Sequence, residues 1–264
     1  MVRSVPAATI KMVQDPCGIF CILFTYTSIV YADYVVIKWV VLHTMQDSLW
    51  APFHIVLFNT FLLLLTVSHL RAMCSDPGTV PLPHTNDSLS DLRQVNEPLV
   101  KREDWTMCTR CETFRPPRAH HCRICKRCIR RMDHHCPWIN NCVGEKNQKY
   151  FVQFLFFVCI LSAYTIMLVI MSWVRECRQC KLYDMDTRQT QVLHSVILIM
   201  ESALFGMFVI AILYDQMDAI YNDQTTMEQT IYKRSNPLHR YIFSSICRWP
   251  KISRSTSKLN IRSV

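Results

Sequence analysis

The sequence has little of what a soluble or secreted protein of its length shows. Its N-terminus has no short apolar segment followed by a cleavage site, which argues against a cleaved secretory signal. Its apolar residues, half of the 264, are not spread evenly but concentrate in four stretches of roughly 20 residues, the length that crosses a bilayer. A soluble globular protein is therefore excluded, and we expect the first apolar stretch to remain as a membrane anchor.

The four apolar stretches predict transmembrane helices, because a helix satisfies its own backbone hydrogen bonds in lipid. The expected spans are residues 19–42, 49–70, 150–174 and 191–214. The connection at residues 43–48 has no Lys or Arg, whereas residues 71–149 carry 14 and the tail at 215–264 carries 8. By the positive-inside rule, residues 1–18, 71–149 and 215–264 are expected in the cytosol.

Charged residues within or beside the membrane allow further predictions. Glu201 and Asp33 lie inside predicted spans, where a charge is costly and often marks an ion path. An ion transporter is thus one alternative, although a structural hydrogen bond is the simpler role for Glu201. The tail after Glu228 has no acidic residue, which predicts attraction to anionic membrane lipids.

A segment rich in cysteine and histidine repeats itself every fourteen residues. Seven Cys and four His lie within 35 residues, which is typical of metal ligands in a reducing compartment and not of secreted disulfides. The pattern Cys108-x2-Cys111-x9-His121-x6-Cys128 recurs as Cys122-x2-Cys125-x9-His135-x6-Cys142. Three thiolates and one imidazole in each copy predict two closed tetrahedral zinc sites. His120 and His134 are also fourteen residues apart, so the spacing leaves open which histidine pair binds.

Cys136 is left outside both predicted sites. It stands fourteen residues after Cys122, but the other ligands of a third site would be Ile139, Lys149 and Phe156. A free cysteine in Asp133-His134-His135-Cys136 has the parts of an activated nucleophile, since an imidazole can take the thiol proton and a carboxylate can orient the imidazole. The alternative is a structural cysteine in an inert, membrane-anchored zinc scaffold.

Three motifs resemble those of one enzyme family. Asp133-His134-His135-Cys136 and the following Pro137-Trp138-Ile139-Asn140-Asn141-Cys142-Val143-Gly144 resemble the signature of the DHHC protein S-acyltransferases. Asp76-Pro77-Gly78 and Thr225-Thr226-Met227-Glu228 are similar to the DPG and TTxE motifs of that family. Residues 125–132 and 147–151 are most similar to its Golgi-associated subgroup. The resemblance implies an α-helical membrane protein whose four helices carry a cytosolic double-zinc domain, about residues 106–149, between the second and third.

The resemblance also implies an activity and the residues that perform it. A protein S-palmitoyltransferase of this family moves a fatty acyl group from acyl-CoA, through acyl-Cys136, to cysteines of substrate proteins. His121 and His135 are then the zinc histidines, His134 and Asp133 act on Cys136, and Thr226 helps to position the Asp133 loop. The implied cofactors are two structural zinc ions, with palmitoyl-CoA as co-substrate. The expected partners are membrane lipids and cytosolic-face substrate proteins with accessible cysteines, without nucleic acid, at the Golgi or alternatively the endoplasmic reticulum.

Overall fold

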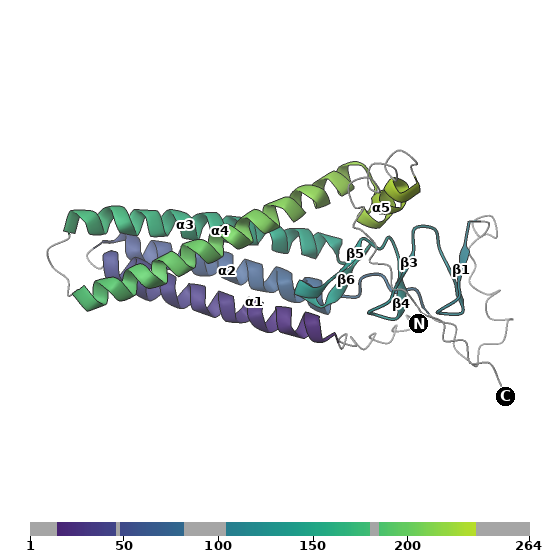
Figure 1. The fold of residues 1–264 in the computed structure, drawn as a ribbon, viewed down its shortest axis with the longest axis horizontal. Coiled ribbons are helices and arrows are strands. Elements are labelled where there is room, and N and C mark those ends of the chain that lie inside the picture. Colours follow the sequence, from purple (N-terminus) through teal and green to yellow (C-terminus); the bar gives the residue numbers. More distant parts are fainter. Residues whose placement is uncertain (1–14, 46–47, 82–103, 180–184, 236–264) are drawn as a thin grey trace, which may run out of the picture.

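A computed structural model describes residues 15–45, 48–81, 104–179 and 185–235 as a bundle of long helices with a domain of short strands at one end (Figure 1). The long helices are α1 (Pro16–Val35), continued by the π-helical segment η1 (Val36–Leu42), α2 (Trp50–Cys74), α3 (Gln148–Gln179) and α4 (Met185–Tyr221). All four are long and apolar enough to cross a membrane. The predicted α-helical membrane fold is confirmed.

Close packing between α3 and its neighbours forms the centre of the bundle. α3 packs against both α2 and α4, and α4 crosses the other helices at an angle (Figure 1). Where α3 meets α4, a Cβ atom added at Gly206 would lie 3.3 Å from Cβ of Ser162, so two small residues allow the helices to approach. α3 and α4 both extend beyond the predicted spans. Between them, residues 180–184 lie outside the described residues.

Three antiparallel hairpins separate α2 from α3. They are formed by β1 (Thr106–Cys108) with β2 (Thr113–Arg115), β3 (His120–Cys122) with β4 (Arg127–Ile129), and β5 (His134–Cys136) with β6 (Asn141–Val143). Corresponding strands begin fourteen residues apart. Left-handed backbone recurs with the same period at Glu112, Lys126 and Asn140, with φ of 50°, 54° and 44°. The sequence repeat therefore has three structural copies, one more than its two predicted ligand sets.

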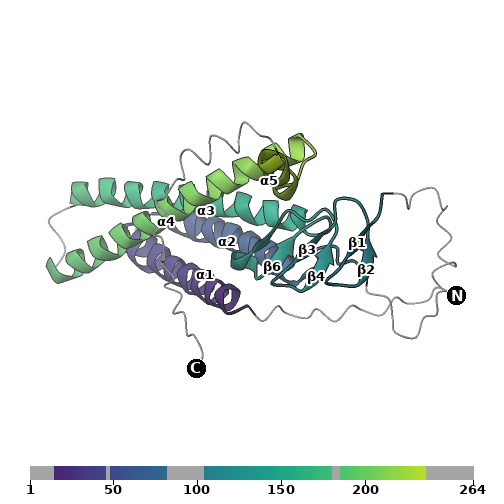
Figure 2. The same ribbon diagram turned by 45° about the vertical axis from the view of Figure 1, so that its right-hand side comes forward.

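The β5–β6 hairpin lies nearest the helices and β1–β2 farthest from them (Figures 1 and 2). The side-chain amide of Asn141 donates to the carbonyls of Ala72 and Met73 in the last turn of α2 and of Ser75 just after it, at 2.9 to 3.3 Å, and that of Asn147 donates to the carbonyl of Ala72 at 3.2 Å. These carbonyls have no partner within the helix. Gly18 of α1 lies so close to Asn140 that an added Cβ atom would be 2.3 Å from its Oδ1. Two helix ends thus hold this hairpin.

The Asp76-Pro77-Gly78 motif connects α2 to the hairpins. Asp76 Oδ1 accepts hydrogen bonds from the backbone N–H of Gly78 and of Thr79, at 3.3 and 2.9 Å. Gly78 has a φ of 104°, which a residue with a Cβ atom rarely adopts, and its carbonyl accepts from the N–H of Arg130 at 2.8 Å. At Gly144, a Cβ atom would lie 2.5 Å from the carbonyl oxygen of Pro77. Close packing of the motif against the hairpins therefore requires glycine at two positions, Gly78 in the motif and Gly144 after β6.

The short helix α5 (Thr226–Ser235) follows α4 and returns to the hairpin domain (Figure 1). Nε and Nη2 of Arg118 donate to the two carboxylate oxygens of Glu228 at 2.6 and 2.9 Å, and Arg118 also pairs with Asp223. This bidentate pair ties the start of α5 to the connection between β2 and β3. Most of the predicted N-terminal segment 1–18, part of the 71–149 segment, and the basic tail from residue 236 onward lie outside the described residues.

Candidate active site

Two clusters of Cys and His have the composition and spacing of zinc sites. They are Cys108, Cys111, His121 and Cys128, and Cys122, Cys125, His135 and Cys142. Within each cluster the candidate ligand atoms all lie within 4.8 Å of one another. The sulfur atoms of Cys111 and Cys128 are 3.7 Å apart, and those of Cys125 and Cys142 are 3.4 Å apart. Tetrahedral zinc with bonds of about 2.3 Å to sulfur requires about 3.8 Å between sulfurs, so both clusters fit zinc.

Each cluster links one hairpin to the next. In both, two cysteines come from one hairpin, and a histidine and a cysteine face each other across the next: His121 opposite Cys128, and His135 opposite Cys142. The structure therefore selects His121 and His135, and neither His120 nor His134 joins a cluster. Because successive side chains of a strand point to opposite faces, His134 and Cys136 share the face of β5 that is turned away from His135.

Cys136 occupies the first ligand position of the third hairpin but belongs to neither of the two clusters found among the described residues. Its register partner is Asn141, as Thr113 is for Cys108 and Arg127 for Cys122. The second ligand position is filled by Ile139, which is fully buried in the apolar core beneath the hairpin. The third hairpin therefore has the backbone of the two hairpins before it, while the thiol at its first ligand position, Cys136, belongs to neither cluster.

His134 and Asp133 lie directly beside this thiol. His134 Nδ1 is 2.6 Å from Asp133 Oδ2, and the same imidazole is hydrogen-bonded to Cys136. The ring of Phe151 at the start of α3 packs edge-on against the imidazole, with centroids 5.4 Å apart. The arrangement is a thiol, a base and an orienting carboxylate in series.

The buried Asp133 carboxylate is held by two further donors. Gln216 of α4 donates from Nε2 to Oδ2 at 2.9 Å, and the backbone N–H of Thr226 donates to Oδ1 at 2.6 Å. Burial alone would raise the pKa of Asp133, but the hydrogen bonds from His134, Thr226 and Gln216 lower it to about 2. Burial lowers the pKa of His134, but Asp133 and Cys136 outweigh this effect and raise it to about 9. At neutral pH the pair is therefore a carboxylate and an imidazolium.

Sequence reasoning missed Gln216 and the position of His69. Gln216 lies near the end of α4 and is only 2% exposed. The residues around it in the sequence do not indicate which face of the helix it occupies. His69 of α2 is fully buried; its Nε2–H donates to the carbonyl of Trp138 at 3.0 Å, and its Nδ1 accepts from the Tyr26 hydroxyl at 3.1 Å. Both residues connect membrane helices to the segment that carries Cys136.

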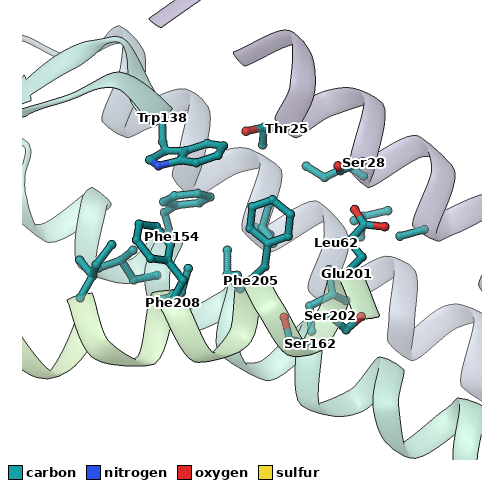
Figure 3. A pocket seen from close by; sticks show the side chains of 18 of the residues that line it. Thr25, Ser28, Leu62, Trp138, Phe154, Ser162, Glu201, Ser202, Phe205 and Phe208 are labelled. Carbon is teal, nitrogen blue, oxygen red and sulfur yellow. The ribbon is translucent and has the colours of Figure 1, made fainter. Parts of the chain in front are cut away.

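A largely apolar cavity runs from Cys136 into the helix bundle. Its empty volume is about 960 Å³ when the open solvent at its mouth is counted, and His134 and Cys136 are among the residues that line it. Five aromatic side chains line it: Phe151, which packs on His134, and Trp138, Phe154, Phe205 and Phe208, which Figure 3 labels. The rings of Trp138 and Phe205 meet edge to face, with centroids 5.9 Å apart. Along α3 the lining extends from Phe151 to Thr165, which at about 1.5 Å per residue is about 21 Å.

A cysteine that lines so long an apolar cavity suits chemistry on a fatty acyl chain. On this ground we assign the membrane protein to the class of acyltransferases. Comparison with known proteins identifies the family. A family model described as DHHC palmitoyltransferase matches residues 101–233. The chain is 35% identical to palmitoyltransferase ZDHHC3 of Homo sapiens, over 85% of this chain and 74% of the relative.

Similar relatives occur in other vertebrates. The chain is 35% identical to palmitoyltransferase ZDHHC3-A of Danio rerio, over 85% of this chain and 69% of the relative. It is 37% identical to palmitoyltransferase ZDHHC7 of Mus musculus, over 84% of this chain and 71% of the relative. The chain belongs to the DHHC palmitoyltransferase family. It is a protein S-palmitoyltransferase, so the activity predicted from the motifs is confirmed, and the scaffold and transporter alternatives are not favoured.

Proposed function

We propose that Cys136 carries the acyl group in a two-step transfer from acyl-CoA to cysteine thiols of substrate proteins. One observation supports this role above the others: Cys136 is hydrogen-bonded to His134 at the mouth of the apolar cavity and belongs to neither zinc-type cluster. The thiol is therefore available both to a base and to a fatty chain.

In the first step, His134 holds the proton of the Cys136 thiol, and the thiolate attacks the thioester carbonyl of acyl-CoA. A bond forms between Cys136 Sγ and the acyl carbon, the bond from that carbon to the CoA sulfur breaks, and His134 returns the proton to the leaving CoA thiolate. Asp133 stabilises the imidazolium that holds the proton between these events. Its own hydrogen bonds to Gln216 and Thr226 keep it ionised and oriented.

In the second step, a substrate cysteine replaces CoA. Its thiol gives its proton to His134, its sulfur attacks the acyl carbon, and the bond to Cys136 Sγ breaks. The acyl chain stays in the cavity during both steps. A length of about 21 Å along α3 exceeds the hydrocarbon thickness of one bilayer leaflet, about 15 Å, so a chain of membrane-lipid length fits.

We assign a structural role to two zinc ions at the Cys/His clusters. Cys108, Cys111, His121 and Cys128 would hold one, and Cys122, Cys125, His135 and Cys142 the other. Four protein ligands complete a tetrahedral site and leave no position for water, so zinc would supply folding energy and not chemistry. Binding at His135 would also orient β5, on which His134 and Cys136 lie.

The membrane layout belongs to the same proposal. Spans at 19–42, 49–70, 150–174 and 191–214 place residues 1–18, 71–149 and 215–264, and therefore Cys136, on the cytosolic side, where acyl-CoA is available. The charge asymmetry of the connections supports this orientation. The subgroup resemblance supports the Golgi as the membrane, with cysteines of cytosolic-face proteins as acceptors.

The test is labelling of the full-length protein with a clickable palmitate analogue supplied as its CoA ester. Wild type is expected to gain a hydroxylamine-sensitive label and to pass it to an acceptor cysteine, and Cys136→Ser is expected to do neither while retaining about two zinc ions per chain. Cys74→Ser is a matched control, because Cys74 is a free thiol at the end of α2 outside both clusters. Acyl transfer by Cys136→Ser, or its loss of a zinc ion, would contradict the assignment.

A further inference from the structure

The first turn of α1 lies against the hairpin that carries Cys136 (Figures 1 and 2). α1 packs on the short 3-10 helix η4 (Pro137–Ile139), which connects β5 to β6. The N-cap residue of α1 is Asp15, whose Oδ2 accepts a hydrogen bond from the backbone N–H of Gly18 at 3.2 Å. The first N–H groups of a helix have no partner within it, so this bond stabilises the helix start. Capping therefore keeps the Asp15 carboxylate beside the β5–β6 hairpin.

The same carboxylate faces the imidazole of His135. Asp15 Oδ2 lies 3.7 Å from His135 Nε2, and the two side chains are only 16% and 7% exposed. The other ring nitrogen of His135, Nδ1, faces the second cluster, at 3.3 Å from the sulfur of Cys125 and 3.7 Å from that of Cys142. The imidazole therefore lies between the thiols of a zinc-type cluster on one side and a single carboxylate on the other.

The ring nitrogen that faces Asp15 needs a hydrogen-bond acceptor. Zinc held by Nδ1 would leave the proton of the neutral imidazole on Nε2. This nitrogen is buried and has no hydrogen-bond partner within the part of the chain that the structure describes. A buried donor without an acceptor is unfavourable, and a shift of about 0.8 Å would bring the carboxylate to the usual N–H···O distance of about 2.9 Å. A histidine that binds a metal almost always donates its second N–H to a group of this kind.

The orientation of His135 affects both of its neighbours in the chain. β5 is only three residues long, and His135 stands between His134 and Cys136. Side chains alternate along a strand, so a rotation of the backbone at His135 would move both neighbours on the opposite face. An imidazole fixed at both ring nitrogens would therefore hold His134 and Cys136 in place.

We propose that Asp15 is a positioning residue whose carboxylate accepts the Nε2–H of zinc-bound His135, strengthens the second zinc site and holds β5 against α1. The inference rests on the proposed function, in which His135 binds zinc and Cys136 carries the acyl group. The first cluster provides an internal comparison, because its histidine, His121, belongs to a different hairpin. Loss of the Asp15 carboxylate is therefore expected to weaken the second site and not the first.

The test measures the zinc affinity of each cluster separately. Full-length protein in detergent is equilibrated with increasing concentrations of a zinc chelator and then treated briefly with N-ethylmaleimide, and alkylation of each cysteine is read by peptide mass spectrometry. In Asp15→Ser the affinity of the second cluster is expected to fall 10- to 100-fold, the usual effect of removing such a partner, while that of the first is unchanged. The two clusters are reported by separate sets of cysteines: Cys108, Cys111 and Cys128 for the first, and Cys122, Cys125 and Cys142 for the second.

Three features of the variants separate this role from helix capping and from surface charge. Serine still caps the helix, because its hydroxyl can accept from the N–H of Gly18, but its shorter side chain cannot reach His135. Asp15→Asn keeps a carbonyl oxygen at the same place and is expected to recover most of the zinc affinity. Glu145→Gln removes an exposed carboxylate three residues after Cys142 and is expected to leave both affinities unchanged.

The activity of the zinc-saturated protein gives a second measurement. In Asp15→Ser the initial rate of acyl-Cys136 formation from palmitoyl-CoA is expected to fall about tenfold. Equal zinc affinity of the second cluster in wild type and Asp15→Ser would overturn the positioning role, and so would an equal loss from both clusters. A wild type that forms no acyl-Cys136 would instead refute the proposed function, while the zinc measurement would still decide the role of Asp15.

Discussion

Replacement of Asp133 by Asn tests how the buried carboxylate controls its neighbour. The substitution keeps the shape of the side chain but removes the charge that His134 Nδ1 contacts at 2.6 Å. The pKa of His134 is about 9, roughly 2.5 units above its ordinary value, and Asp133 is the first of the two partners that raise it. If Asp133 supplies at least half of the rise, its loss lowers the pKa by about 1.2 units or more, which is about 1.7 kcal/mol at 1.36 kcal/mol per unit.

The sign of the expected pH effect follows from the protonated imidazole. His134 must hold a proton to return it to the CoA thiolate, so acylation by wild type is expected to decline above pH about 9. In Asp133→Asn this alkaline decline is expected to begin at least one pH unit lower, and the maximal rate is expected to fall by about 10²- to 10⁴-fold, the usual contribution of general acid and base catalysis. The assay is the initial rate of acyl-Cys136 formation from palmitoyl-CoA between pH 6 and 10.

Asp223→Asn provides the matched control. Asp223 is also a carboxylate paired with a cation, but its partners are Arg118 and Arg131 and its side chain is 71% exposed. The pH profile is expected to keep its shape in this variant. The assignment of Asp133 as the group that keeps His134 protonated would be refuted by one result. That result is a rate of acylation in Asp133→Asn that declines at the same pH as in wild type, in protein with normal zinc content.

Two further predictions concern the zinc clusters and the Cys136 loop. Cys142→Ala is expected to reduce the zinc content from about two per chain to about one or less and to lower the melting temperature, because a closed site contributes folding energy; unchanged zinc by metal analysis would show that Cys142 is not a ligand. His69→Leu removes the donor to the Trp138 carbonyl and leaves that buried acceptor without its partner, at about 1–3 kcal/mol, so the rate of acyl-Cys136 formation is expected to fall about tenfold with zinc content kept. A rate equal to wild type would mean that this hydrogen bond does not position the loop.

Much of the fold and of the zinc chemistry could be predicted from the sequence, because the signals are local. A transmembrane helix is recognised by the length and apolar character of one segment, and all four helices were expected. The fourteen-residue repeat grouped the six cluster cysteines into the same two sets that the structure brings together, and it left open which histidine pair joins them. The same repeat identified Cys136 as the thiol left over, since its other ligand positions are apolar or basic residues.

Other features depend on which faces of distant segments meet, which spacing does not specify. The alternation of side chains along β5 turns His135 toward the second cluster and His134 toward Cys136, a choice that two equal fourteen-residue spacings could not make. Gln216 reaches Asp133 across 83 residues of sequence because the end of α4 lies beside the residue that precedes β5. Glu201 appears in the sequence only as a carboxyl in an apolar span. The packing of four helices around one cavity made it part of the same lining as Cys136, because a cavity is formed by the gaps between packed surfaces and no single segment encodes it.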